Sequence, residues 1–189
     1  MFLKHDVLCS HTMVQTNPLR RIRFWLAVFI AGLVLSGITA FPLQTELGWL
    51  VALLHGSWLR PIAEFSHLLP WVERVNGALS ETNRNYPFLA YGTDWLAFAH
   101  LVLAVAFIGP WIDPVRNKWV ITFGLIACAG VIPLALIAGP IRGIPLSWRL
   151  IDCSFGIFGS IPLLICRELV CALERGIDLS CCEGSDRKG

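Results

Sequence analysis

Charged residues are scarce in this sequence. Only 15% of its 189 residues are Asp, Glu, Lys or Arg, whereas 56% are hydrophobic, and the mean hydropathy is +0.66. Soluble domains carry about 25% charged residues, so this composition excludes an ordinary soluble protein. The formal net charge of only +2 is too small to indicate a nucleic-acid partner.

The motifs of common catalytic and cofactor sites are also absent. The sequence has no Gly-rich phosphate loop, no Gly-x-Ser-x-Gly elbow and no Cys-x-x-Cys pair. A haem held by two histidines needs two imidazoles inside apolar segments, and only His100 lies in one. Because the histidines also lack metal-ligand spacing, we expect no metal site, and the residues identify no cofactor. The Cys181–Cys182 pair lies in a hydrophilic tail, where we expect spare, reduced thiols.

Four long apolar segments are the main feature of the chain. They cover residues 24–41, 95–112, 119–141 and 150–166, and Asp152 is the only charged residue inside them. Each is long enough for a helix rising ~1.5 Å per residue to cross a ~30 Å hydrocarbon core. Tryptophans lie close to their ends, as is typical of membrane interfaces: Trp25, Trp95, Trp111, Trp119 and Trp148. The sequence therefore predicts an all-α polytopic membrane protein, a bundle of four transmembrane helices.

Small residues and one tight turn predict how these helices pack. Gly32, Ser36 and Ala40 recur at intervals of four, a pattern that lets membrane helices approach closely. Residues 113–118 form a short connection with a proline, which predicts that the second and third helices are antiparallel neighbours.

The basic residues predict the orientation of the chain. Ten lie on the side of the termini and five on the other, so the positive-inside rule places both termini in the cytoplasm. Residues 1–23 and 167–189 are then cytoplasmic segments. Met13 precedes a basic cluster, so residues 1–12 could be an extension of the native N-terminus.

The long connection, residues 42–94, has helical character. Apolar residues between 47 and 58 recur at helical spacing, and a second run covers residues 61–75. The first run is too short to cross a bilayer and Pro61 interrupts it. We expect an amphipathic helical cap on the outer side, either interfacial or re-entrant, followed by a polar loop over residues 76–87.

Ionisable residues inside the apolar segments mark the candidate site, because such groups are costly in a membrane unless they are paired or functional. His100 and Asp152 lie at similar depths, ~7.5 and ~6 Å inside the tryptophans at their helix ends. We expect one outward-facing polar pocket that contains Tyr91, Asp94, His100, Arg142, Arg149 and Asp152.

Simpler roles compete with this hypothesis. Asp94 follows Thr93 at a predicted helix start, where it would cap free N–H groups. Asp152 would form an ion pair with Arg149, three residues earlier. The imidazole of His100 would be satisfied by a hydrogen bond to a neighbouring helix.

Residues 87–166 carry a resemblance. The runs Pro-Phe-Leu-Ala-Tyr-Gly-Thr-Asp-Trp-Leu-Ala-Phe-Ala-His at 87–100, Gly-Pro-Trp-Ile-Asp-Pro-Val-Arg-Asn-Lys at 109–118 and Ile-Ala-Gly-Pro-Ile-Arg-Gly-Ile-Pro at 137–145 resemble a group of small bacterial proteins with four transmembrane helices. The resemblance covers less than half of the chain. It implies the inner (cytoplasmic) membrane of a bacterium and supplies no activity or catalytic residue.

Three functional classes remain open. The first binds a small ligand, such as a lipid or quinone, with Arg142 and Arg149 on an anionic headgroup. The second is an accessory subunit of a larger membrane complex or a homo-oligomer. The third is a membrane enzyme with His100 as a general base that Asp152 orients. The first two are favoured because no nucleophile, metal set or cofactor motif accompanies the histidine.

Overall fold

The computed structural model describes residues 16–185, with side chains from 18 to 175, and this range contains helices and no strand. Four apolar stretches in it are long enough to cross a membrane: Pro18–Ala40, Pro87–Ile112, Lys118–Ile141 and Leu146–Arg175. The predicted all-α class and four candidate membrane spans are therefore confirmed. The spans are compatible with a multi-pass integral membrane protein.

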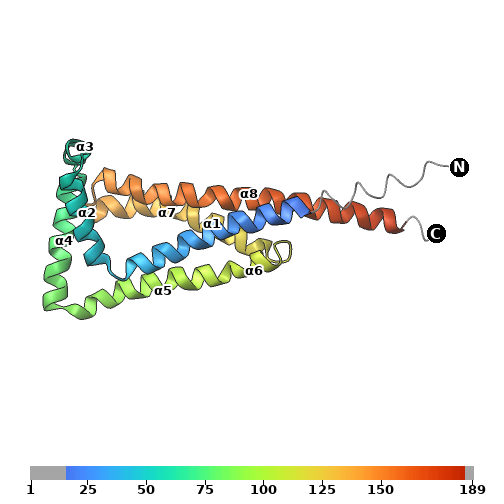
Figure 1. Ribbon diagram of the computed structural model, residues 1–189, viewed down its shortest axis with the longest axis horizontal. Helices are drawn as coiled ribbons and strands as arrows, with labels where there is room; N and C mark the ends of the chain where they lie inside the picture. The colour runs from blue at the N-terminus through green and yellow to red at the C-terminus, as the bar shows by residue number, and fades with distance from the viewer. Residues whose placement is uncertain (1–15, 186–189) are drawn as a thin grey trace.

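The four long helices run lengthwise beside one another (Figure 1), and we call them a row after the order of their contacts. Helix α1 (Thr16–Ala40) packs against α5 (Tyr91–Ala106) on one side and α8 (Leu146–Ser185) on the other, and α8 packs against α7 (Lys118–Ile141). Contact between α5 and α7 is marginal, and short α6 (Ile108–Ile112) joins them at the end where α1 begins. The prediction that the second and third helices are neighbours is therefore wrong for most of their length.

Proline explains why the second predicted helix is two helices. Pro110 lacks an N–H group, and its ring would clash with the carbonyl group of Ala106, where α5 ends. The following turn is held by its own side chains. Asn117 Nδ2 donates hydrogen bonds to the carbonyl oxygens of Gly109 (3.2 Å) and Asp113 (2.9 Å). This turn directs the chain into α7.

The first and the last of the four long helices are longer than the sequence predicted. Helix α1 begins at Thr16, before the expected position 24, and α8 continues past residue 166 to Ser185. The segment expected as a C-terminal tail is thus largely helical. The prediction for residues 1–12 falls outside the described range, and the thiols of Cys181 and Cys182 lie beyond residue 175, where the described side chains end.

Three helices of the long connection lie across one end of the row (Figure 1). They are α2 (Leu43–Gly56), α3 (Arg60–Phe65) and α4 (Leu68–Asn85), and we call them the crossing layer. A 3-10 turn, Pro87–Ala90, leads from α4 into α5.

The predicted loop at residues 76–87 is wrong, because α4 extends through Asn85. Its polar side chains have partners on α2: Gln44 Nε2 donates to Ser80 Oγ (2.9 Å), and Asn83 Nδ2 donates to Gln44 Oε1 (2.7 Å). Residues that look like a loop by composition therefore hold two helices together.

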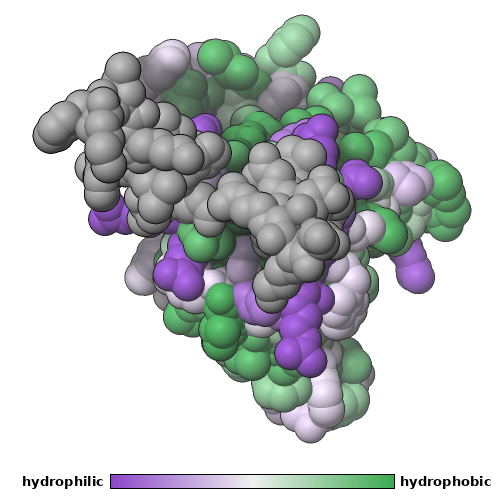
Figure 2. Space-filling model, turned by 90° about the vertical axis from the view of Figure 1, so that its right-hand side faces the viewer, coloured by the Kyte–Doolittle hydropathy of each residue, from purple (hydrophilic) through white to green (hydrophobic). Residues whose placement is uncertain are grey.

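Buried apolar residues form two separate clusters. The layer core joins α2, α3 and α4 and consists of Leu47, Leu54, Ala63, Leu69 and Val72. The closed core joins α1, α7 and α8 near the opposite end and consists of Ile22, Leu26, Phe107, Val120, Ile121, Leu163, Cys166 and Val170. Seen from that opposite end, hydrophilic side chains gather near the helix ends and hydrophobic ones cover much of the flanks (Figure 2).

Candidate ligand-binding cleft

A cleft of about 930 Å³ opens among the four long helices. This volume is within the range of small-molecule sites, about 300–1,000 Å³. Its walls come from α1 residues 28–39, α7 residues 123–139 and α8 residues 152–162, and α5 contributes His100 and Leu103. The cleft therefore lies where the open row of helices has no fifth helix to fill it.

The cleft is blind at the end next to the closed core. The rings of Phe29 and Phe107 meet there with centroids 4.7 Å apart. A Cβ atom on Gly124 would approach Phe107 Cζ to 2.6 Å and Leu163 Cδ1 to 2.8 Å, so no space remains beyond this point. The cleft consequently offers no continuous path along the row of helices.

Three of the six predicted site residues line this cleft: His100, Arg142 and Asp152. Contacts between the helices give the level of each residue, that is, its position along the row relative to the crossing layer. Phe29 lies beside Gly159, and Asp152 is seven residues, or about 10.5 Å, nearer to the crossing layer than Gly159.

The level of His100 follows from the contact between α1 and α5. A Cβ on Gly37 would lie 3.0 Å from the carbonyl oxygen of Ala97. Helices rise ~1.5 Å per residue, so Gly37 is about 12 Å nearer to the crossing layer than Phe29, and His100 is about 4.5 Å further from that layer than Ala97. His100 is therefore about 7.5 Å nearer to the crossing layer than Phe29. Asp152 and His100 are therefore within about 3 Å of the same level, on different walls of the cleft.

The hydrogen bond of His100 fixes its tautomer. Its Nδ1 lies 2.8 Å from the carbonyl oxygen of Leu96, one turn earlier on α5. A carbonyl oxygen only accepts, so Nδ1 donates and Nε2 of the neutral ring is left as an acceptor. The expected bond to a neighbouring helix is wrong, because the partner belongs to the same helix. Within the described residues no hydrogen bond joins His100 to Asp152, so Asp152 does not orient the imidazole.

Arg149 is excluded from the cleft by close helix packing. A Cβ on Gly139 would meet Arg149 Cγ at 2.7 Å, so the arginine stem lies against the backbone of α7. Its Nε is buried without a hydrogen-bond partner in the described structure. The predicted ion pair with Asp152 is not formed among the described residues, whose salt bridges lie elsewhere.

Tyr91 and Asp94 also lie outside the cleft. Tyr91 is exposed and stacks edge-on against Trp95, with ring centroids 6.0 Å apart. The N-cap of α5 is Ala90 and has no side-chain cap, so the predicted capping role of Asp94 is wrong, although Asp94 remains in the first turn. The helix begins earlier than expected because the 3-10 turn precedes it.

Sequence reasoning missed the α1 wall. Gly32 and Ser36 were expected to pack against another helix, but a Cβ on Gly32 would meet nothing within 4 Å, and both residues line the cleft. Thr39 adds a second hydroxyl group there. The spacing of small residues is the same for a packing face and for a cleft wall, so the sequence held no signal to separate them.

The described residues contain no group of three His, Cys, Asp or Glu side chains that could hold a metal ion. Comparisons with family models, curated proteins and solved structures each give no match to this chain. The resemblance to small bacterial membrane proteins therefore stays a prediction.

Proposed function

We propose that this multi-pass membrane protein binds one lipid-like amphiphile in the cleft and catalyses no reaction on it. The observation that carries the proposal is the distribution of polarity along the cleft. His100, Arg142 and Asp152 lie toward the crossing layer, whereas the blind end is apolar. An amphiphile has the same polarity profile, with a polar head and an apolar chain.

The length of the cleft supports an occupant from one leaflet. Asp152 and Pro162 both line the α8 wall and are ten residues apart, which is about 15 Å of helix. That is half of a ~30 Å hydrocarbon core. A lipid of the leaflet next to the crossing layer would have its chain against this wall. The marginal contact between α5 and α7 gives it a lateral entrance.

The polar end supports a head that both donates and accepts hydrogen bonds. Arg142 donates and carries positive charge, whereas Asp152 and His100 Nε2 accept. Such a head occurs on hydroxylated or phosphorylated lipids and on quinols. A catalytic role for His100 is not favoured by this geometry, because Asp152 does not orient it.

The basic residues support an outward orientation of the site. They concentrate around the end of the row opposite the crossing layer, where Arg20, Arg21, Arg23, Arg116 and Lys118 gather. The positive-inside rule then places this end in the cytoplasm, with both termini, and the crossing layer outside. In a bacterial inner membrane the outer side is the periplasm.

Filling the cleft tests the proposal. Gly32→Phe puts a ring into the cleft where a Cβ meets no atom, and Gly130→Phe is the matched control on α7, equally open but not a cleft residue. We expect native mass spectrometry of mildly solubilised protein to show one retained amphiphile in the wild type and in the control. Gly32→Phe should lower the retained fraction about tenfold.

Two results would contradict the proposal. Equal retention by both variants would place the lipid on the outer surface of the helices. A protein partner that co-purifies with the wild type and the control but is lost from Gly32→Phe would instead favour an accessory subunit, with a partner segment in the cleft. Circular dichroism checks that both variants keep their helix content.

A further inference from the structure

A group of large apolar side chains is exposed on the crossing layer, away from the four spanning helices. At the corner between α2 and α3, the exposed fractions are 82% for Trp58, 60% for Ile62 and 89% for Phe65. We call these three residues the corner ridge. Soluble surfaces seldom expose several large apolar residues together, and such a group marks an interaction surface.

The corner ridge is the part of the two apolar runs that the layer leaves exposed, since Trp58 ends the first run, residues 47–58, and Ile62 and Phe65 belong to the second, residues 61–75. Two members of the first run, Leu47 and Leu54, are buried against α4 in the layer core. They are therefore not available to a membrane or to another protein. The ridge is the apolar surface that remains after the layer has formed its own core.

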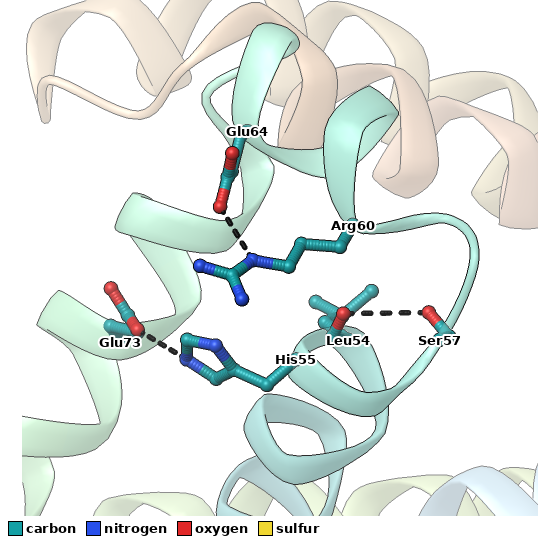
Figure 3. A network of polar contacts seen from close by, with 6 residues as sticks. All are labelled: Leu54, His55, Ser57, Arg60, Glu64 and Glu73. Carbon is teal, nitrogen blue, oxygen red and sulfur yellow. Dashed lines mark hydrogen bonds and ion pairs between the residues drawn. The ribbon is translucent and has the colours of Figure 1, made fainter.

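Polar side chains of the same corner are turned away from the ridge. Arg60 Nε donates to Glu64 Oε1 (2.7 Å), one turn along α3, and His55 Nε2 lies 2.7 Å from Glu73 Oε1 on α4 (Figure 3). On α3, residues 60 and 64 share one face, whereas 62 and 65 share another. The corner is thus amphipathic, with one ion pair within α3 and one between α2 and α4.

The crossing layer lies directly at the ends of the long helices, and this position indicates what covers the ridge. Helix α2 starts after a two-residue turn from the end of α1, and α4 is followed at once by the turn into α5. Four exposed aromatic residues gather at this second junction. The rings of Tyr86 and Phe88 meet edge-on with centroids 6.2 Å apart, and those of Tyr91 and Trp95 with centroids 6.0 Å apart. Tyrosine and tryptophan gather in this way at membrane–water interfaces.

The exposed face of α4 is charged and suits water, since it carries Glu73, Arg74, Glu81 and Arg84. We propose that the corner ridge inserts into the headgroup region of the adjacent leaflet and holds the crossing layer flat on the bilayer. The occupant is lipid because the short connections of the layer to α1 and α5 hold the ridge at the level of the adjacent leaflet. This proposal is independent of what the cleft binds.

Nitroxide labels test the proposal directly. One label replaces Phe65 and a matched control label replaces Glu81 on the charged face of α4, each in a cysteine-free variant in phosphatidylcholine vesicles. We expect the label at 65 to collide several-fold more with oxygen than with a water-soluble nickel chelate, and the label at 81 to show the reverse. Equal nickel access at both sites would overturn the proposal, and so would protection of 65 from both reagents, which would indicate a protein partner.

A second measurement needs only single substitutions in the otherwise natural chain. Trp58→Phe should remove part of the tryptophan fluorescence that phosphatidylcholine brominated near the glycerol quenches. Trp71→Phe, a half-buried position on α4, is the control and should leave that quenched fraction almost unchanged. If Trp58→Phe also leaves the fraction unchanged, Trp58 is not in the headgroup region and the proposal is wrong.

Discussion

The two halves of the helix row differ in how their space is filled. In the half next to the start of α1, side chains of the closed core fill the space between α1, α7 and α8. In the half next to the crossing layer, the same helices leave a cleft of about 930 Å³. The closed half holds the helices together, whereas the ionisable residues of the cleft lie in the open half. Binding is thus assigned to the open half, whereas close packing of α7 against α8 extends through both halves.

Gly156 on α8 and Gly32 on α1 both line the cleft, and they show that its walls differ in how closely the helices approach. At Gly156 the backbones of α7 and α8 are so close that a Cβ would come within 2.5 Å of the carbonyl oxygen of Cys128. At Gly32 on α1 a Cβ would meet nothing within 4 Å. Membrane helices associate through close contacts of small residues. A glycine therefore marks contact only where a second backbone is actually present.

The largest expected effect comes from breaking the close contact. Gly156→Ala puts its Cβ against a backbone oxygen that cannot rotate away. Overpacking of this kind costs about 1–3 kcal/mol, occasionally more, so we expect the variant to unfold at a clearly lower temperature in detergent. Gly130→Ala, where a Cβ meets nothing, is the control and should be neutral or more stable by up to about 1 kcal/mol. Equal unfolding temperatures would show that α7 and α8 are not in close contact at Gly156.

A substitution in the open half should change binding and leave the stability of the empty protein unchanged. Asp152→Asn removes a charge that has no ion-pair partner among the described side chains. A hydrogen bond to a charged group contributes about 1.5–3 kcal/mol, so the retained amphiphile should bind about tenfold more weakly or worse. Titration of delipidated protein with the identified lipid measures this. A change in unfolding temperature without a change in affinity would show that Asp152 contributes to stability and not to binding.

Much of the fold could be predicted from the sequence because hydropathy is a local property. The four apolar segments lie where the structure has its four candidate membrane spans. The polar stretch of α4 could not be predicted, because Ser80 and Asn83 bond to Gln44, which is far away in the sequence. Composition alone does not separate a polar loop from a polar helix contact.

Two candidate site residues could be singled out from the sequence for a similar reason. His100 and Asp152 stand out as ionisable residues within apolar segments, and the structure places both in one cleft. The position of Arg149 depends on the missing side chain of Gly139 on another helix, which no local pattern records. The sequence also gave no way to tell that Gly32 faces a cleft.

The smallest expected effect concerns an ion pair at the closed end. Lys118 Nζ, at the start of α7, donates to Glu174 Oε2 on α8 at 2.5 Å, and both side chains are about one-third exposed, 34% and 32%. Partly exposed pairs contribute about 0–1 kcal/mol, so Lys118→Ala and Glu174→Ala should each lower stability by less than about 1 kcal/mol. A double-mutant cycle on thermal unfolding isolates the pair energy. If the contact between α7 and α8 depends on packing rather than on charge, this energy stays well below the effect of Gly156→Ala. A larger value would mean that the ion pair, and not the closed core, is what joins α7 to α8 at that end.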